Sequence, residues 1–205
     1  MTAACHLEVL VEEPPMEAFL SELLDRLLIG RSTFKVHPFQ GKADLLDKLE
    51  ARLRAYAAWL PADHRVVVVV DRDDEDCHNL KRRLEDMARR SGLSTRSTPR
   101  SGSWQVVNRI VVEELESWYF GDWQAVCAAY PRVGNRINRS KKYRDPDAIQ
   151  GAWEAFERVL QRCGYFKTGL RKVELAHRLG PLIERERSSS RSFNTFCDAI
   201  LEAVA

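Results

Sequence analysis

The acidic residues of this sequence that could do chemistry gather in two short stretches, each directly after a run of apolar residues. Glu12 and Glu13 follow the alternating segment CHLEVLV, and DRDDED, in which five of six residues are acidic, follows five consecutive valines. Carboxylates held this close together repel one another unless a cation neutralises them. Because oxygen ligands suit hard divalent ions and not zinc, the two stretches predict a Mg²⁺ or Mn²⁺ site.

The elements that must hold these acids alternate between strand and helix. Apolar residues alternate over 5–11 and then recur with helical spacing over 15–28, and a second such pair follows over 34–39 and 42–60. The valine run is typical of a strand buried on both faces of a parallel sheet, and the helix after it is expected to end near Gly92. The pattern predicts an α/β fold with a mostly parallel sheet flanked by helices.

Ligands of such sheets bind outside the carboxyl ends of the strands, which is where both acidic stretches fall. If the first and third strands are neighbours, Glu12 converges with Asp71 and Asp73, which are two residues apart and can point the same way in an extended segment. An alternative is that DRDDED only caps the next helix and compensates its dipole. That alternative suits residues 74–76 better than Asp71, which directly ends a buried strand.

The two stretches resemble parts of Toprim domains, the metal-binding fold of topoisomerases, bacterial primases and overcoming-lysogenization-defect nucleases. LVEEPPMEAFLSELL resembles their VEGxxE opening, and VVVVVDRDDED resembles their strand that ends in DxD. Together with HPFQGKADLL, ELESWYFGD and SRSF, these stretches resemble the bacterial domain-of-unknown-function family 4276, a member of the wider Toprim group. The resemblance covers nearly the whole chain.

The resemblance implies a role for each acid. Glu12 matches the glutamate that acts in general acid/base chemistry or holds metal, Asp71 and Asp73 match the metal-binding DxD, and Glu17 matches the second acid of the opening motif. The motif's glycine is Glu13 here, which leaves the backbone less free to approach phosphate.

A further acid lies in ELESWYFGD, where Glu116 and Trp118 match an E-x-W element of related proteins. Glu116 is therefore expected to be a fifth metal-ligating residue. The alternative is an amphipathic helix with solvated glutamates and core aromatics.

The second half of the chain is basic. Residues 1–130 hold 17 basic and 21 acidic side chains, a net charge of −4, whereas residues 131–205 hold 15 and 9, a net charge of +6. The segment NRINRSKKYR concentrates five cations around Tyr143, and Lys42 adds another near the acids; the five are Arg136, Arg139, Lys141, Lys142 and Arg144. These cations are expected to bind nucleic acid, although a solvated basic face is the alternative.

The expected activity is Mg²⁺- or Mn²⁺-dependent cleavage of nucleic acid, DNA rather than RNA, with Glu12, Asp71 and Asp73 as catalytic residues. The resemblance implies an ABC- or AAA-type ATPase partner in anti-phage defence or DNA repair. The competing interpretation is a non-catalytic Toprim-like regulatory or binding subunit that docks on an ATPase.

Two domains are predicted: a Toprim-like α/β domain over 1–125, and a basic, mostly helical extension over 126–205. LSTRST and WQVVNRIVV are predicted to complete the sheet as further strands.

The GK pair at 41–42 lacks the spacing of a P-loop. Five scattered cysteines without a CxxC pair, and the lack of a signal-peptide pattern or a long apolar segment, favour a cytoplasmic protein without a membrane span.

Overall fold

A computed structural model describes residues 5–100 and 103–205 of the 205-residue chain. Its centre is a sheet of four parallel strands in the order β2-β1-β3-β4. The strands are β1 (Cys5–Val11), β2 (Ser32–Pro38), β3 (His64–Asp71) and β4 (Val106–Val111). The predicted α/β fold with a parallel sheet is confirmed.

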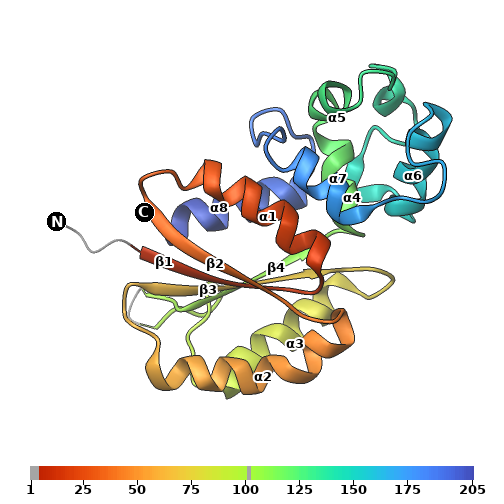
Figure 1. Ribbon diagram of the computed structural model, residues 1–205. Coiled ribbons are helices and arrows are strands. Elements are labelled where there is room, and N and C mark those ends of the chain that lie inside the picture. The colour runs from red at the N-terminus through yellow and green to blue at the C-terminus, as the bar shows by residue number, and fades with distance from the viewer. Residues whose placement is uncertain (1–4, 101–102) are drawn as a thin grey trace.

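Helices cover both faces of this sheet. Figure 1 shows α2 and α3 beneath the sheet, α1 and α8 above it, and α4 to α7 gathered beyond one end. Their bounds are α1 (Pro14–Leu27), α2 (Lys42–Trp59), α3 (Cys77–Arg90), α4 (Leu115–Gly121), α5 (Trp123–Ala129), α6 (Ala152–Arg162), α7 (Lys172–Leu179) and α8 (Arg191–Ala203), with short 3₁₀ turns η1 (Ile137–Arg139) and η2 (Pro146–Ala148). Among the described residues, no helix is both long enough and apolar enough to cross a membrane.

The valine run of β3 explains the two-faced packing. Val67 and Val69 belong to the apolar cluster beneath α1, α4 and α8, whereas Val66, Val68 and Val70 belong to the cluster formed with α2 and α3. Successive side chains of a strand point to opposite faces, so a run of five β-branched residues supplies both cores at once. All five valines are fully buried.

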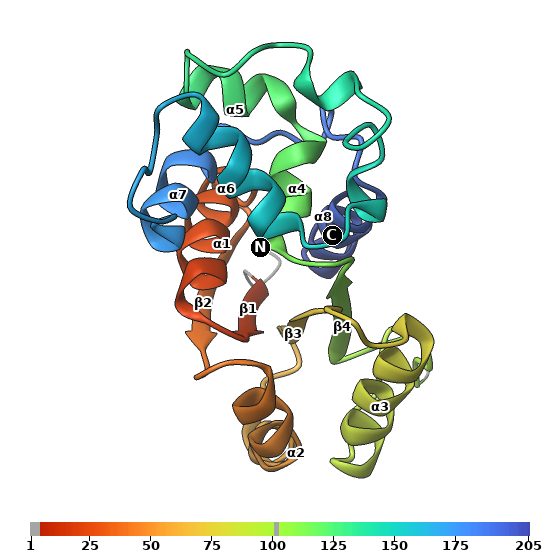
Figure 2. The same cartoon turned by 90° about the vertical axis from the view of Figure 1, so that its right-hand side faces the viewer.

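The helices of the second half pack onto the same core as the sheet. α7 lies against α1, α8 lies against β4, and one continuous apolar cluster extends from β1 to α8. Figure 2 shows α4 to α7 grouped on the side of the molecule opposite α2 and α3. The boundary at 125/126 divides this shared core, and the division into two domains stays a prediction.

One predicted strand is wrong. Residues 93–98 form only isolated bridges, from Thr95 to Thr98 and to Val106, and no named strand. The Thr95 and Thr98 hydroxyls bond to each other at 2.9 Å, and the Thr98 amide donates to the Thr95 hydroxyl at 3.2 Å. Such local side-chain bonds compete with the sheet ladder for the same backbone groups, so they favour a turn here.

Candidate functional site

The adjacent strands β1 and β3 bring Glu12 and Asp71 into direct contact. Val11 pairs with Val69 in the parallel register, so the residues that follow lie side by side at the carboxyl ends of the strands. One carboxylate oxygen of Glu12 accepts a hydrogen bond of 2.6 Å from the Asp71 backbone amide. Both side chains are buried, each with 8% of its surface exposed. The predicted convergence of Glu12 with the end of the valine strand is therefore present.

Burial leaves the Asp71 carboxyl group poorly compensated. Its Oδ1 atom is buried and has no hydrogen-bond partner among the described residues. Burial raises the pKa of Asp71 well above its usual range, and the neighbouring Glu12 and Glu116 carboxylates raise it further. Burial also raises the pKa of Glu12 to about 7, although the hydrogen bond from the Asp71 amide opposes the rise. Both shifts mean that burial favours the neutral, protonated form of these two carboxyl groups.

Glu116 is the third buried acid of this region. It lies in the first turn of α4 with 2% of its surface exposed. Burial raises the pKa of Glu116 to about 7, and the positive charge of Lys172 opposes the rise. The segment is helical, as the alternative reading of ELESWYFGD held, but Glu116 is buried, not solvated. We call Glu12, Asp71 and Glu116 the acidic cluster.

Asp73 is placed differently from Asp71. Its backbone has a φ of +50°, and its amide donates to the Glu113 carbonyl at 3.1 Å, which turns the chain after one residue. Its side chain is 48% exposed and forms an ion pair of 3.2 Å with Lys42. The two aspartates of the DxD stretch therefore do not share one extended face, because the left-handed residue ends the extended conformation that the alternation rule requires.

Lys42 acts as a built-in cation beside the acids. Its ammonium group donates to the backbone carbonyls of Asp71 and Arg72 at 2.8 and 2.9 Å, and it also pairs with Glu75 at 2.9 Å. Burial lowers the pKa of Lys42, but its bond to Glu75 and the charge of Asp73 outweigh that effect and raise it. The expectation of a cation near the site is met, although its role as a contact to nucleic acid stays a prediction.

Two other residues of DRDDED form local contacts. Asp76 is the N-cap of α3, and its side chain accepts a 2.8 Å hydrogen bond from the Asn79 amide. Arg72 pairs with Glu113. The helix-cap alternative thus describes Asp76 correctly but does not describe the buried Asp71.

Glu13 and Glu17, the acids that follow Glu12 in the sequence, lie at the start of α1. Glu13 is the N-cap, with an extended backbone (φ −150°) whose carbonyl accepts from the Met16 and Glu17 amides. Any residue adopts that conformation, so the loss of the motif's glycine does not strain this turn. Glu17 is half-buried in the first turn of α1, where a negative charge also compensates the helix dipole.

Lys172 is the residue near the cluster that sequence reasoning missed. It is the first residue of α7, and its side chain is partly buried. Burial lowers the pKa of Lys172, but the charges of Glu116, Glu13, Glu114 and Asp71 outweigh it and raise the pKa. No motif marks this lysine, because it follows Glu116 by 56 positions and reaches the acids only through the packing of α7.

The carboxylate oxygens of these acids are the ligand type that a divalent cation prefers, but the acids are arranged for such a cation only in part. The buried, unpartnered oxygen of Asp71 next to the Glu12 carboxylate is the donor type that Mg²⁺ prefers. Within residues 5–100 and 103–205, however, no three His, Cys, Asp or Glu side chains are grouped so that they could hold a metal ion. Asp73, which the sequence predicted as a third metal ligand, forms an ion pair with Lys42 instead.

The basic segment 136–144 lies at the other end of α4. All five of its cations are exposed, whereas the Tyr143 ring stacks on Phe120 of α4 at 4.9 Å and carries the Lys142 ammonium on its other side at 5.3 Å. Tyr143 is therefore engaged by the core and is not a free ring for stacking a base. Glu116 and Phe120 are four residues apart on α4, about 6 Å along the helix axis, and Arg139 lies farther on, beside Trp123 and Cys127 of α5.

Comparison with known proteins gives one match. A family model described as "Domain of unknown function (DUF4276)" matches residues 11–201. The search of curated proteins and the search of solved structures each found no match. The matched range includes every residue of the acidic cluster and the basic segment.

Proposed function

Since the chain belongs to the family described as Domain of unknown function (DUF4276), a description that assigns no activity, we propose a function from the site itself. The function is Mg²⁺- or Mn²⁺-dependent hydrolysis of phosphodiester bonds in nucleic acid. The observation that carries the proposal is the Asp71 carboxyl group, which is buried beside Glu12 at the carboxyl ends of two parallel strands with one oxygen unpartnered among the described residues. Ligands of parallel α/β sheets bind at this edge.

Glu12 and Asp71 are the residues that would hold the ion, with Glu116 and the more distant Glu17 as further candidates. Asp73 can become a further ligand only if its ion pair with Lys42 breaks. Its side chain is 48% exposed and can therefore turn toward the ion. When bound, a divalent ion lowers the pKa of a water molecule and stabilises the charge of the phosphoryl transition state.

The chain's own groups supply a titratable carboxyl group and positive charge. In the metal-free protein, burial raises the pKa of Glu12 to about 7, so near neutral pH either a proton or a bound cation can neutralise this side chain. Lys42 and Lys172 place two ammonium groups at the edge of the cluster, where they can stabilise a phosphate oxygen.

The substrate proposed for this site is DNA rather than RNA. The exposed cations at Arg136, Arg139, Lys141, Lys142 and Arg144 support binding of a polyanion, because they are gathered in one segment and form no ion pair with an acid of the described residues. The resemblance to Toprim nucleases adds a cytoplasmic ABC- or AAA-type ATPase partner, and a role in anti-phage defence or DNA repair, to the proposal.

The test is calorimetric titration of Mn²⁺ and Mg²⁺ into the wild type, Asp71→Asn and the control Asp145→Asn, an exposed acid. Single-stranded and duplex DNA and RNA are incubated in parallel. Metal binding and cleavage should both be lost in Asp71→Asn and kept in Asp145→Asn. Asp71→Asn should fold, because it removes a buried charge that the fold disfavours. A wild type that binds neither ion at millimolar concentration contradicts the proposal.

A second candidate function has one specific observation in its favour. Lys42 holds two carbonyls of the β3 end and pairs with both Asp73 and Glu75, so the loop after β3 is neutralised without a metal. This arrangement supports a non-catalytic binding or regulatory subunit that docks on an ATPase. A wild type that binds neither ion and cleaves no nucleic acid would favour this candidate, whereas metal binding without cleavage would point to a missing partner of the nuclease.

A further inference from the structure

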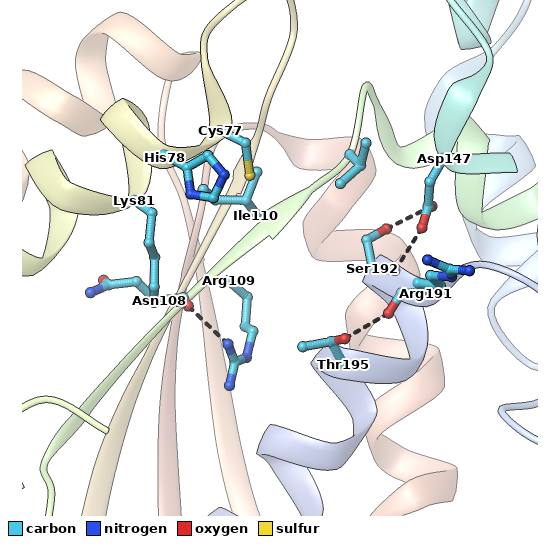
Figure 3. Close-up of a pocket in the computed structure, with 11 residues that line it drawn as sticks. Cys77, His78, Lys81, Asn108, Arg109, Ile110, Asp147, Arg191, Ser192 and Thr195 are labelled. Carbon is cyan, nitrogen blue, oxygen red and sulfur yellow. Dashed lines mark hydrogen bonds between the residues drawn. The ribbon is translucent and has the colours of Figure 1, made fainter. Parts of the chain in front are cut away.

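A pocket of about 420 Å³ lies beside the edge strand β4, between α3 and α8. Figure 3 shows Cys77, His78 and Lys81 on the α3 side, Arg191, Ser192 and Thr195 on the α8 side, and residues of β4 between them. Its volume is within the range of small-molecule sites, about 300 to 1,000 Å³. The acidic cluster lies elsewhere, at the carboxyl ends of β1 and β3.

Arg109 is the unusual residue of this pocket. Its Nε and Nη2 atoms are buried and have no hydrogen-bond partner in the described part of the chain. Within the described residues, its guanidinium donates one long hydrogen bond of 3.4 Å, from Nη1 to the Asn108 carbonyl. Burial lowers the pKa of Arg109 to about 10, and the nearby charge of Arg96 lowers it further. A guanidinium is buried at a cost unless an anion pairs with it.

The other charges around the pocket leave a positive excess. Lys81 forms an ion pair of 2.7 Å with Glu85, so Arg109 and Arg191 against Asp147 leave a net charge of +1 when His78 is counted as neutral. Asp147 is already engaged, because it accepts hydrogen bonds from Ser190 and Ser192. Arg191 is exposed and can turn toward a ligand.

The rest of the lining is apolar or weakly polar. Besides His78 and Asn108, the lining includes Ile110, Val112, the thiol of Cys77 and Thr195 of α8. A ligand that fits must therefore combine a compact, strongly charged anionic group with a less polar body. A phosphomonoester carries about −1.5 to −2 charges near neutral pH and accepts hydrogen bonds at three oxygens, which suits a positively charged pocket and the fork of Arg109.

We propose that this pocket is a binding site for a nucleotide-type phosphomonoester, with the phosphate on Arg109 and Arg191 and the nucleoside over Ile110 and Val112. The negative charge of the phosphate would pair with the Arg109 guanidinium and offset the cost of burying its charge. A free nucleotide and the 5′-phosphate at the end of a nucleic-acid strand both carry this phosphomonoester group. This site does not depend on the proposed nuclease activity, since none of the acidic cluster lines it.

Calorimetry tests the proposal in a buffer with a chelator, which prevents phosphate from binding through a metal at the acidic cluster. The probes are inorganic phosphate, adenosine 5′-monophosphate and uncharged adenosine. The nucleotide should bind the wild type, and Arg109→Gln and Arg191→Gln should each weaken the affinity at least tenfold. The matched control Arg158→Gln removes the same charge from an exposed position of α6 and should bind like the wild type.

Two oligonucleotides that differ only in a 5′-phosphate or a 5′-hydroxyl identify the source of the phosphate. Tighter binding of the phosphorylated strand assigns the site to strand ends, and binding of the mononucleotide alone assigns it to a free nucleotide. If circular dichroism shows that Arg109→Gln does not fold, the affinity of Arg191→Gln alone tests the proposal, because the Arg191 side chain is exposed. The proposal is wrong if adenosine binds as well as its monophosphate, if both variants bind like the control, or if no probe binds at millimolar concentration.

Discussion

At the residue scale, the acids at the carboxyl edge of the sheet differ in what compensates their charge. Asp73 has an ion pair with Lys42, and Glu12 has a backbone amide. Glu116 is buried, with Lys172 as the main opposing charge. The acids that are least compensated and most buried are therefore Asp71 and Glu116, and their protonation should govern how the stability of the metal-free protein depends on pH.

The first prediction concerns Glu116→Gln. Burial raises the pKa of Glu116 from an ordinary value of 4.5 to about 7 in the folded protein. The folded state therefore binds a proton that the unfolded state releases, so this contribution to stability is complete below about pH 4.5 and is lost as the pH rises through about 7. Relative to the wild type, Glu116→Gln should gain up to about 3 kcal/mol of unfolding free energy between about pH 5 and pH 8. Urea unfolding across this range, with a chelator present, measures the gain.

A matched control for this experiment is Glu186→Gln, because Glu186 is exposed. Its unfolding free energy should follow that of the wild type at every pH. If Glu116→Gln shows the same flat difference as the control, Glu116 titrates normally in the folded protein and is not a buried acid.

Among single residues, the sequence predicts those whose position follows from strand order and misses those placed by distant packing. Glu12 and Asp71 could be paired because both directly follow strands that a parallel sheet makes neighbours. Lys172 and Arg109 carry no motif. Lys172 reaches the acids through the docking of α7 on α1, and Arg109 is distinguished only by the missing partners of its guanidinium among the described residues.

At the element scale, the close approach of α1 and α7 determines where Lys172 lies. Gly180 ends α7, and a Cβ atom added there would lie 2.7 Å from the Glu22 Cβ and 2.9 Å from the Phe19 carbonyl oxygen. Those two atoms belong to α1, whose backbone cannot move without disturbing the core. The small residue is therefore a condition for this packing.

Gly180→Ala should therefore destabilise the protein by about 1 to 3 kcal/mol, because the methyl group overpacks the helix pair. The backbone at Gly180 is right-handed, so conformational strain does not contribute. Urea denaturation provides the measurement. Gly134→Ala is the control, since its added Cβ would meet Ile137 only at an ordinary 3.7 Å. Equal stability of the two variants would mean that α7 lies farther from α1 than described.

The segment before α8 is held to α5 by one buried acid. Asp122 is 1% exposed, caps α5 through the Ala125 amide, accepts from the Glu184 amide at 2.9 Å and pairs with Arg187 at 2.8 Å. Asp122→Asn should lower the unfolding free energy by about 3 kcal/mol, because an amide cannot satisfy all these donors and leaves Arg187 unpaired. Urea unfolding checks this loss. Glu186→Gln, adjacent to Arg187 but exposed, should be neutral, and a neutral Asp122→Asn would contradict the role of Asp122 as a link.

The elements themselves were largely predictable, and the exceptions have local causes. The alternation of 5–11, the helical spacing of 15–28 and the valine run each correspond to an observed element, because binary patterning selects the type of structure that buries it. Residues 93–98 look like a strand by composition, yet their hydroxyl groups bond locally. The turn at Asp73 has a positive φ without a glycine to signal it, so its effect on the DxD pair could not be predicted.

At the scale of the whole molecule, the acids and the basic segment, which are separated along the sequence, also lie in different places in the fold. The acids lie at the carboxyl edge of the sheet, and α4 leads from Glu116 to Phe120, on which the basic segment rests through Tyr143. The exposed cations of residues 136–144 form the surface that is expected to contact phosphates. Binding of nucleic acid by this surface should therefore depend on salt, because each phosphate contact releases bound counterions.

Arg136→Gln/Arg139→Gln provides the corresponding test. If both arginines contact phosphate, the slope of the logarithm of the association constant against the logarithm of salt concentration should become less steep by about 0.7 per contact for single-stranded DNA, or about 0.9 for duplex DNA. Fluorescence anisotropy of labelled DNA at several salt concentrations measures the slope. The control Arg31→Gln/Lys35→Gln removes the same charge from two exposed positions outside this segment and should lower affinity only slightly, with the slope unchanged. If the two double variants reduce the slope equally, general attraction to a positive protein accounts for binding and segment 136–144 is only a solvated basic face.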